Sequence, residues 1–478
     1  MRPPPVRSRR PALLILAALG SMIWLPAQAT AALLAVAFAR TLVLLASRRR
    51  GAGVRGLPAL RGRSSRPPPT RALVLGEDPA GRAVLIGEHQ LSAHGLILGA
   101  SGAGKSTTLL RILSDQIARG APVLAVDLKG SPGFAGRLGA AASAAGRPLR
   151  VWTPDGPELW NPLAHGNPTQ LKDKLIATER FTEPHYQRAA ERYLQLALQA
   201  LVRSGGPRSL IMVTDLLEPK RLARLARSLP DEQSERLREY LAGLTADQLS
   251  AIRGLSSRLA IITESHTGAY LDDPTAVGID LRRALAGEEV VLFSLNSSAY
   301  GKLAAQLGAL AVQDLLTAVG DRLDSGGGRQ AIVAIDEFSA LGSDNVIALL
   351  ARGREAGVSV LLATQELADL DRAARGLRDQ VLGNTALKIA HRQEVPQSAA
   401  TVAQMAGTVR YWERSYNTRR GPLGLARPAG ESFRPAQRQA VDPETVRTLP
   451  TGAAVLITKL PGAATRLVRV RDREARER

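Results

Sequence analysis

The chain of 478 residues contains no cysteine and only six histidines. The absence of cysteine excludes disulfide bonds and thiolate metal sites, and it suits a protein that works in the reducing cytosol. The histidines are scattered, without the i, i+4 spacing that a helical zinc site uses. We therefore expect no transition-metal site, and the chemistry of the chain has to come from other residue types.

Acidic residues and lysines are absent from the first 76 positions, where all thirteen charged residues are arginines. Without these arginines the formal net charge of the chain falls from +20 to +7. Arginines beside an apolar segment act first as topology signals, so most of the basic excess has a membrane explanation. The remainder permits a polyanionic partner such as nucleic acid but does not require one.

A long segment near the N-terminus carries no charged side chain. It covers residues 11–39, PALLILAALGSMIWLPAQATAALLAVAFA, and a second apolar segment, TLVLLAS, follows Arg40. One membrane span needs about 20 residues, so this length predicts two short spans that turn near Pro26, with the arginine-rich ends in the cytoplasm. The alternative is a signal peptide that is cleaved near Ala27 or Ala29.

The rest of the chain, with its 45% apolar composition overall, predicts an α/β domain that is interrupted by helices. Short apolar strands alternate with helical spacing at both ends of this part, whereas leucines recur every three or four residues in its middle. The expected parts are a membrane anchor at 1–50, a linker at 51–70, a nucleotide-binding domain at 71–166 and 286–470, an all-α insert at 167–285 and a charged tail at 471–478.

A phosphate-loop motif, GASGAGKS, occupies residues 99–106 between a short apolar strand and a segment with helical spacing. In such a loop, backbone N–H groups at a helix N-terminus bind phosphates. We expect Lys105 to neutralise the β- and γ-phosphate oxygens, and the Ser106 hydroxyl to hold Mg²⁺. The expected cofactors are ATP and Mg²⁺, and the expected binding residues are Gly99, Ala100, Ser101, Gly102, Ala103, Gly104, Lys105, Ser106 and Thr107.

Two adjacent carboxylates, Asp336 and Glu337, end the apolar strand in IVAIDEF. Ligands gather at the carboxyl ends of strands in open parallel sheets, so this position favours a catalytic role. We expect Asp336 to position the metal, commonly through water, and Glu337 to act on the attacking water. The alternative is that the two charges cap the next helix.

Four further polar residues lie at strand ends or just before a strand. Gln365 ends a strand that we expect beside the one carrying Asp336, where it either aims an amide at the γ-phosphate or is only a polar strand end. Arg354 precedes that strand, so it is either a solvated helix end or a finger that reaches the phosphate of a neighbouring subunit. Asp127 and Lys129, in VDLKG, end a strand that we expect next to the phosphate loop, where they either serve catalysis or the moving substrate or belong to a surface turn.

The ordered set of motifs resembles the TraG/TraD-like coupling proteins of bacterial conjugation and type IV secretion, which belong to the FtsK/HerA superfamily of P-loop ATPases. The resemblance covers most of the chain, from the apolar N-terminal hairpin to the last strand. The segments that carry it are HGLILGASGAGKST, VLAVDLKG, LRRALAGEEVVLFSLN, AIVAIDEFSALG, GREAGVSVLLATQ and LGNTALKIAHR.

This resemblance implies a RecA-like fold with a mainly parallel sheet, an inserted all-α domain and a transmembrane helical hairpin. It implies a homohexamer in the inner or plasma membrane, multi-pass, with its ATPase domain in the cytoplasm. The implied activity is ATP-driven translocation of relaxase-bound DNA, single-stranded and without sequence preference, into a secretion channel. In that family Arg354 matches the arginine finger and Gln365 the polar residue that senses the nucleotide. The connection between the two apolar segments is shorter than in many members.

Two rival functions remain open. A double-stranded DNA pump of the FtsK type shares the core, but it usually carries more spans and a C-terminal winged helix, and neither is visible in the sequence. A membrane NTPase adaptor for protein secretion would use the helical insert to bind protein cargo. The sequence argues against an ABC transporter, since no LSGGQ-like signature lies between the phosphate loop and Asp336.

Overall fold

The structure is a computed structural model that describes residues 72–178, 181, 183–341, 343–420 and 426–471. The expected membrane anchor and linker, and the tail after Arg471, lie outside these residues. Among the described helices, only α14 (Lys302–Asp324) is long and apolar enough to cross a membrane, and 67% of its apolar window is buried inside the protein. This helix is therefore part of the core, and no described helix supports a multi-pass protein.

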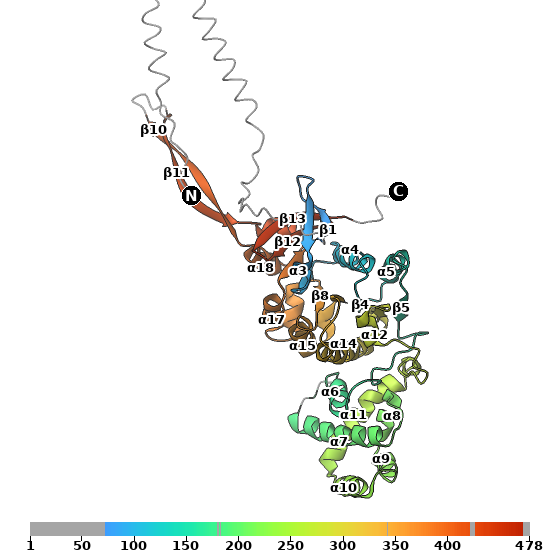
Figure 1. Cartoon of the computed structure of the whole chain (residues 1–478). Helices are drawn as coiled ribbons and strands as arrows, with labels where there is room; N and C mark the ends of the chain where they lie inside the picture. The colour runs from blue at the N-terminus through green and yellow to red at the C-terminus, as the bar shows by residue number, and fades with distance from the viewer. Residues whose placement is uncertain (1–71, 179–180, 182, 342, 421–425, 472–478) are drawn as a thin grey trace, which may run out of the picture. The chain divides into compact units, whose positions relative to one another are not determined.

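Eleven of the described strands form one sheet (Figure 1). The strands from β9 to β5 are parallel, and β2, β1, β13 and β12 extend the sheet with antiparallel pairs. This agrees with the predicted mainly parallel α/β fold. The order across the sheet is β2 (Ala83–Gly87), β1 (Ala72–Glu77), β13 (Ala464–Val470), β12 (Ala453–Thr458), β9 (Leu387–Ala390), β3 (Gly95–Leu98), β8 (Val358–Thr364), β7 (Ala331–Asp336), β4 (Val123–Asp127), β6 (Val290–Ser294) and β5 (Leu149–Trp152).

Helices cover both faces of the parallel strands, which explains why those strands are apolar along their whole length. In β4, Val123 and Ala125 belong to one hydrophobic cluster, together with residues of α4 (Lys105–Ala118) and α5 (Pro132–Ala144). Leu124 and Val126 belong to the other cluster, which includes α14. The other helices beside the core strands are α3 (Glu88–Leu91), α12 (Leu281–Ala286), α13 (Ser297–Tyr300), α15 (Ser343–Gly353), α16 (Leu367–Ala373), α17 (Leu377–Asn384), α18 (Pro396–Ala406) and α19 (Pro443–Arg447), with a short 3-10 turn at Phe338–Leu341.

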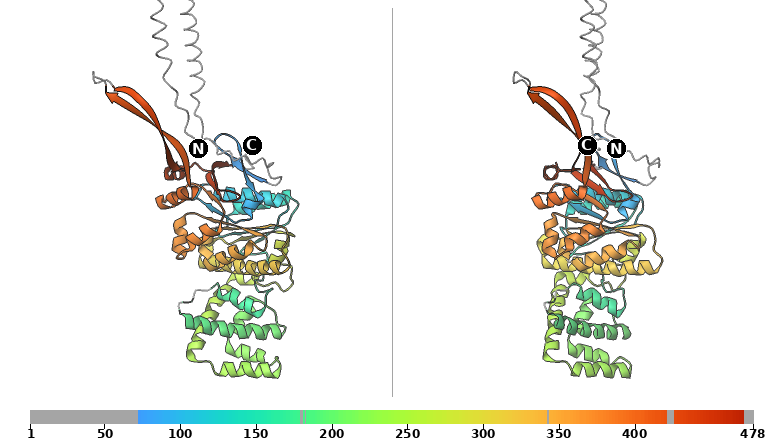
Figure 2. Two further views of the ribbon diagram at one scale, coloured as in Figure 1. Left: turned by 60° about the vertical axis from the view of Figure 1, so that its left-hand side comes forward. Right: turned by 90° about the vertical axis from the view of Figure 1, so that its left-hand side faces the viewer.

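Between β5 and α12 the described residues form a stack of helices, which Figure 2 shows as a separate layer beyond α14. Buried leucines recur along α7 and α11, and these two helices pack against each other. The helices are α6 (Pro168–Ile176), α7 (Pro184–Arg203), α8 (Leu210–Leu216), α9 (Pro219–Ala226), α10 (Asp231–Ala242) and α11 (Ala246–Thr263), followed by a 3-10 turn at His266–Tyr270.

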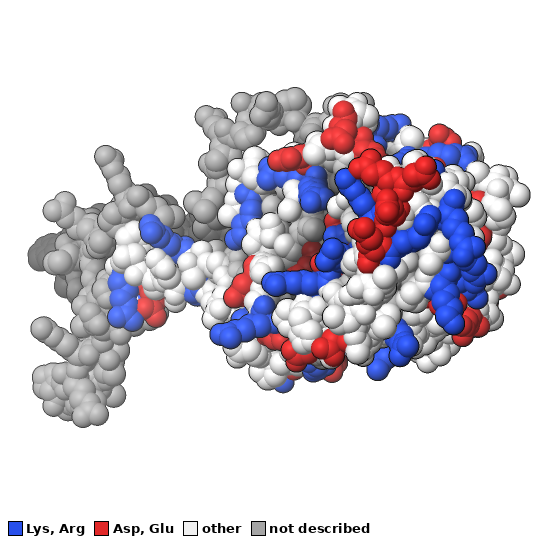
Figure 3. All heavy atoms as spheres, turned by 90° about the horizontal axis from the view of Figure 1, so that it is seen from below, with Lys and Arg blue, Asp and Glu red and all other residues white. Residues whose placement is uncertain are grey.

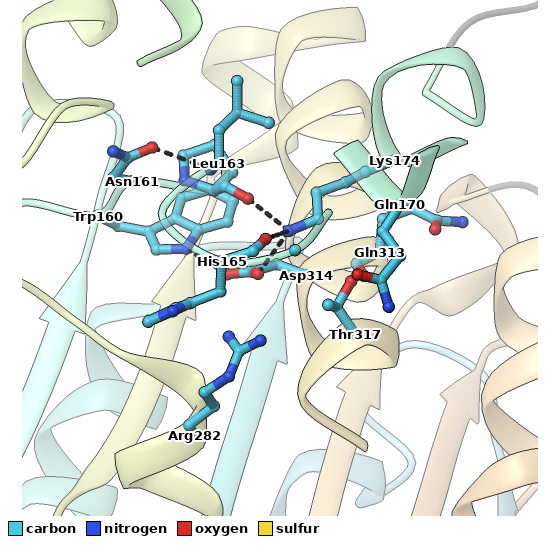
Figure 4. Close-up of polar contacts among 12 residues, drawn as sticks. Trp160, Asn161, Leu163, His165, Gln170, Lys174, Arg282, Gln313, Asp314 and Thr317 are labelled. Carbon is cyan, nitrogen blue, oxygen red and sulfur yellow. Dashed lines mark hydrogen bonds and ion pairs between the residues drawn. The ribbon is translucent and has the colours of Figure 1, made fainter. Parts of the chain in front are cut away.

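A buried ion pair connects this helical stack to the core (Figure 4). The Lys174 ammonium of α6 lies 2.8 Å from an Asp314 carboxylate oxygen of α14, and it donates to the Pro162 carbonyl at 2.5 Å. The indole N–H of Trp160 donates to the second oxygen of Asp314 at 2.9 Å. These contacts satisfy both charges in a place that water does not reach.

Strands β10 (Thr408–Arg420) and β11 (Ala426–Gln439) pair with each other in a separate two-stranded sheet. The Arg414 guanidinium lies 5.9 Å from the centre of the Phe433 ring, and Arg434 forms an ion pair of 2.6 Å with Glu413. The sequence does not predict this hairpin, because its many arginines and other polar residues hide the alternation that marks a half-buried strand.

Candidate nucleotide-binding site

The phosphate loop runs from the end of β3 into α4, as the motif predicts. Gly102 and Gly104 have φ angles of 72° and 116°, which favour glycine. A Cβ atom on Gly99 would lie 2.7 Å from the Cβ of His391, and one on Gly104 would lie 3.1 Å from the Cα of Gly452. The loop is therefore a backbone cradle that side chains would fill, and the first N–H groups of a helix such as α4 are suited to bind a phosphate.

Lys105 points from the first turn of α4 into the interior, where its side chain is only 4% exposed. Its ammonium donates to the Gly99 carbonyl at 2.6 Å and lies 3.8 Å from the nearest Glu337 carboxylate oxygen. Burial lowers the pKa of this lysine, and the positive charge of Lys129 lowers it further, against the opposing effect of Glu337. A buried cation with acidic neighbours is suited to pair with a phosphate.

Asp336 and Glu337 lie at the carboxyl end of β7, as predicted, and their environments differ. Asp336 is buried, and burial raises the pKa of its carboxyl although the positive charge of Lys129 opposes this. Glu337 has a φ of 56°, and its N–H donates to an Asp336 carboxylate oxygen at 3.0 Å. The positive φ of Glu337 turns the backbone directly after Asp336. Asp336 is therefore buried, as suits a metal ligand, whereas Glu337 lines a surface groove.

One carboxylate oxygen of Glu337, Oε1, is the meeting point of the site. Lys129 Nζ lies 2.7 Å from it, and Gln365 Nε2 donates to it at 3.1 Å. Gln365 follows β8, which pairs with β7 as the sequence predicts. The structure thus brings together Lys105, Glu337 and Gln365 from three separate segments.

The segment with Asp127 and Lys129 is not next to the phosphate-loop strand, contrary to the sequence analysis. Strands β7 and β8 lie between β4 and β3. The Asp127 carboxylate accepts the N–H groups of Lys129 at 2.9 Å and Ser131 at 2.8 Å, so it fixes the turn. Burial raises the pKa of Asp127. Lys129, by contrast, contacts Glu337. The sequence leaves open whether this lysine belongs to the site or to a surface turn.

Arg354 lies apart from this cluster. It follows α15, and its side chain is exposed. Its charge acts on His94, which directly precedes β3, at the opposite end of that strand from the phosphate loop. Burial lowers the pKa of His94 to about 4, and Arg354 contributes to the same direction. Arg354 thus lies near the amino ends of the parallel strands, whereas the phosphate loop follows the carboxyl end of β3. Within one chain, Arg354 therefore does not reach a phosphate in the loop.

Two features of the site have no motif in the sequence. His391, after β9, contacts the Thr108 hydroxyl through Nε2 and the Ala453 carbonyl through Nδ1, both at 2.8 Å. These contacts connect α4, which follows the phosphate loop, to β9 and β12. A groove of about 440 Å³ opens beside Glu337. Its lining residues are Glu337, Ser339, Ala340, Gln365, Asp369, Arg372 and Ala373.

Two family models match the chain. Residues 330–451 match the model "TraM recognition site of TraD and TraG", and residues 73–147 match "Helicase HerA-like C-terminal". No curated protein matches at a significant level.

Solved structures share the fold at low sequence identity. The unbound form of the bacterial conjugative coupling protein TrwBdeltaN70 is 16% identical, with a TM-score of 0.63 over 85% of this chain and 90% of that chain. The plasmid coupling protein TrwB in complex with ADP and Mg²⁺ is also 16% identical, with a TM-score of 0.59 over 85% and 92%. VirB4 of Thermoanaerobacter pseudethanolicus is 14% identical, with a TM-score of 0.56 over 86% and 98%. The two family models and this common fold together confirm the resemblance to the TraG/TraD-like coupling ATPases of the FtsK/HerA superfamily that the sequence motifs indicate.

Proposed function

We propose that this protein is a membrane-anchored ATPase that translocates DNA and delivers a relaxase-bound strand to a conjugation or type IV secretion channel. One observation carries the proposal: Lys105 and Gln365 both lie close to Glu337. The three side chains lie beside the glycine-rich phosphate loop, at the carboxyl ends of the parallel strands. The coupling-protein fold and the family models give this ATPase site its context.

The residues at the site fit ATP and Mg²⁺. Residues 99–107 would hold the phosphates through backbone N–H groups, and Lys105 would add its positive charge. Ser106 and Asp336 would hold the metal, which supplies neutralisation of phosphate charge when it is bound. Glu337 would accept a proton from the attacking water, and Gln365, which donates to Glu337, would orient that water. The TrwB structure with ADP and Mg²⁺ supports this assignment.

The position of Arg354 supports a homohexamer. This exposed arginine lies near the amino ends of the parallel strands, at the opposite end of β3 from the phosphate loop. It therefore serves catalysis only if it reaches the site of a neighbouring subunit. A ring in which each subunit completes the next site couples hydrolysis around the ring, as a translocating motor needs. The two arginine-flanked apolar segments, at 11–39 and 41–47, support anchoring in the inner or plasma membrane with the ATPase domain in the cytoplasm.

The end of the helical stack has no uniform basic surface. Figure 3 shows this face with lysines and arginines interspersed among aspartates and glutamates. Such a mixed surface is unlike the continuous basic track expected of a site that grips a nucleic-acid backbone. We infer that these helices serve partner selection, and that DNA is gripped elsewhere in the ring.

The test is DNA-stimulated ATP hydrolysis by the full chain, measured with single- and double-stranded DNA of equal length. We expect single strands of any sequence to stimulate, and the logarithm of affinity to fall with the logarithm of salt by roughly 0.7 per phosphate contact. Stimulation by duplex DNA alone would favour the FtsK-like pump. ATPase activity in a well-folded protein that binds no DNA would favour the protein-secretion adaptor.

A further inference from the structure

Two close donors and a more distant ammonium group surround a single anionic oxygen in the site. They are Lys129 Nζ at 2.7 Å, Gln365 Nε2 at 3.1 Å and the more distant Lys105 Nζ at 3.8 Å, all measured to Glu337 Oε1. Two cations and an amide around one oxygen are also the environment that a phosphate oxygen prefers. The carboxylate of Glu337 and a γ-phosphate bound in the loop would therefore compete for the same donors.

Lys129 is the member of this group with the shortest contact, and its backbone is held firmly. The Asp127 carboxylate fixes the N–H groups on both sides of the turn, at Lys129 and Ser131. A Cβ atom on Gly130, whose φ is 64°, would lie 2.5 Å from the Asn296 nitrogen, so the turn is tightly packed. The lysine side chain is 36% exposed, against 15% for Glu337, and its ammonium contacts Glu337 from this fixed turn.

Lys129 carries the positive charge that is needed to hold the Glu337 carboxylate in place. Burial lowers the pKa of Lys129, but the hydrogen bond to Glu337 and the charges of Asp336, Glu337 and Asp127 raise it overall, so the ammonium stays charged. Glu337 has a positive φ, which disfavours a residue with a Cβ. Its carboxylate is held by the contacts with Lys129 and Gln365.

We propose that Lys129 is a positioning residue that holds Glu337 as an internal substitute for a phosphate oxygen and releases it towards the attacking water. Release occurs when Lys129 and Gln365 donate to a phosphate oxygen in place of Glu337 Oε1. The carboxylate then gains the freedom to accept a proton from water. This inference rests on the proposed ATPase function, and it makes activation of Glu337 conditional on a triphosphate.

The proposal is tested by nucleotide affinity, without turnover. The full chain binds either a non-hydrolysable ATP analogue or ADP, each with Mg²⁺, and the affinity is measured by calorimetry. Glu337→Gln should bind the analogue about tenfold more tightly, the size of one released charge-assisted hydrogen bond, and leave ADP affinity within about twofold. In the Lys129→Gln background the same substitution should gain less than about threefold, since the two residues act as a pair.

Like-charge repulsion between Glu337 and the γ-phosphate is the competing explanation. It predicts that Glu337→Gln gains as much, or more, when Lys129 is absent, and that result would overturn the proposal. Lys129→Arg keeps the positive charge and should keep most of the gain, and a gain as small as in Lys129→Gln would also overturn it. Lys220→Gln, an exposed charge change in α9, is the matched control and should leave affinity unchanged.

The experiment separates this inference from the proposed function. If the wild-type chain binds neither nucleotide, the ATPase assignment itself is wrong. If it binds both and the gain is independent of Lys129, only the positioning role is wrong.

Discussion

Lys105 is the residue whose loss the site tolerates least. Its ammonium is buried and is anchored to the Gly99 carbonyl, so the loop has a fixed positive charge among its backbone donors. We expect Lys105→Ala to abolish hydrolysis and to weaken ATP binding by at least about 1.5 kcal/mol, the value of a hydrogen bond to a charged group. Glu337→Gln should retain ATP binding and hydrolyse it very slowly. Wild-type turnover in the glutamine variant would remove Glu337 from the mechanism.

His391 makes the stability of the phosphate-loop region depend on pH. Burial lowers the pKa of this histidine to about 4 from an ordinary value of 6.5, so the folded state keeps it neutral while the unfolded chain takes up a proton. Its contribution is present above pH 6.5 and is lost as the pH falls through this window, by about 2 kcal/mol at pH 5.

The measurement is the melting temperature at pH 7 and pH 5 for the wild type and for His391→Gln. The glutamine keeps a donor for the Ala453 carbonyl and an acceptor for the Thr108 hydroxyl. Its melting temperature should fall less between the two pH values than that of the wild type. Asp127 and Asp336, whose raised pKa values act in the opposite direction, are present in both proteins and cancel in the comparison. Equal falls would show that His391 does not titrate in this range.

At the residue scale the sequence predicts those side chains that follow a fixed spacing. The positions of Lys105, Asp336 and Glu337 follow from the phosphate-loop motif and from an apolar strand that ends in two acids. His391 and Lys129 acquire their contacts only when β9 and β4 take their places in the sheet. Strand order depends on packing between distant segments, so local pattern does not reveal it.

Among the elements, α6 and α14 are joined by charges that water does not screen. The Lys174 and Asp314 side chains are 1% and 7% exposed. Removing one member of such a pair leaves an uncompensated buried charge, so Lys174→Met alone should lower the free energy of unfolding by roughly 3 to 5 kcal/mol.

Adding Asp314→Asn to Lys174→Met should restore most of the loss, because asparagine is neutral and still accepts the Trp160 N–H. Chemical denaturation of the wild type, Lys174→Met, Asp314→Asn and the double variant measures the effect. The matched control is Lys172→Met, whose ion pair with Asp173 lies nearer the surface and should cost less than about 1 kcal/mol. If Lys174→Met costs no more than the control, the pair does not hold the helices to the core.

The elements that the sequence predicts best are the continuous apolar strands of the parallel sheet. Strand β7 reads AIVAID and is buried along its whole length, so hydrophobicity alone identifies it. Strands β10 and β11 lack such a run, and β11 contains prolines, which are typical of edge strands and weaken any strand assignment. The prediction fails where a strand does not face a core.

For the whole molecule, motif order predicts more than composition does. The two halves of the parallel sheet are separated in sequence by the helical stack, and only the sequence of phosphate loop, acidic strand end and glutamine indicates that they belong to one site. The same order places Arg354 before β8, and the structure leaves it at the opposite edge from the phosphate loop. A role for this arginine in catalysis therefore requires a second subunit.

The prediction at this scale is that Arg354 acts across a subunit boundary. Arg354→Ala should bind ATP but lose most turnover, because a guanidinium supplied by a neighbour stabilises charge in the transition state. Arg354→Lys should rescue little, since a point charge lacks the planar fork. Arg354→Ala has a sound phosphate loop and Lys105→Ala a sound finger, so mixed rings contain some complete sites. Activity recovered on mixing the two inactive proteins would support the finger in trans, whereas normal DNA-stimulated turnover by Arg354→Ala alone would show that the arginine is only a solvated helix end.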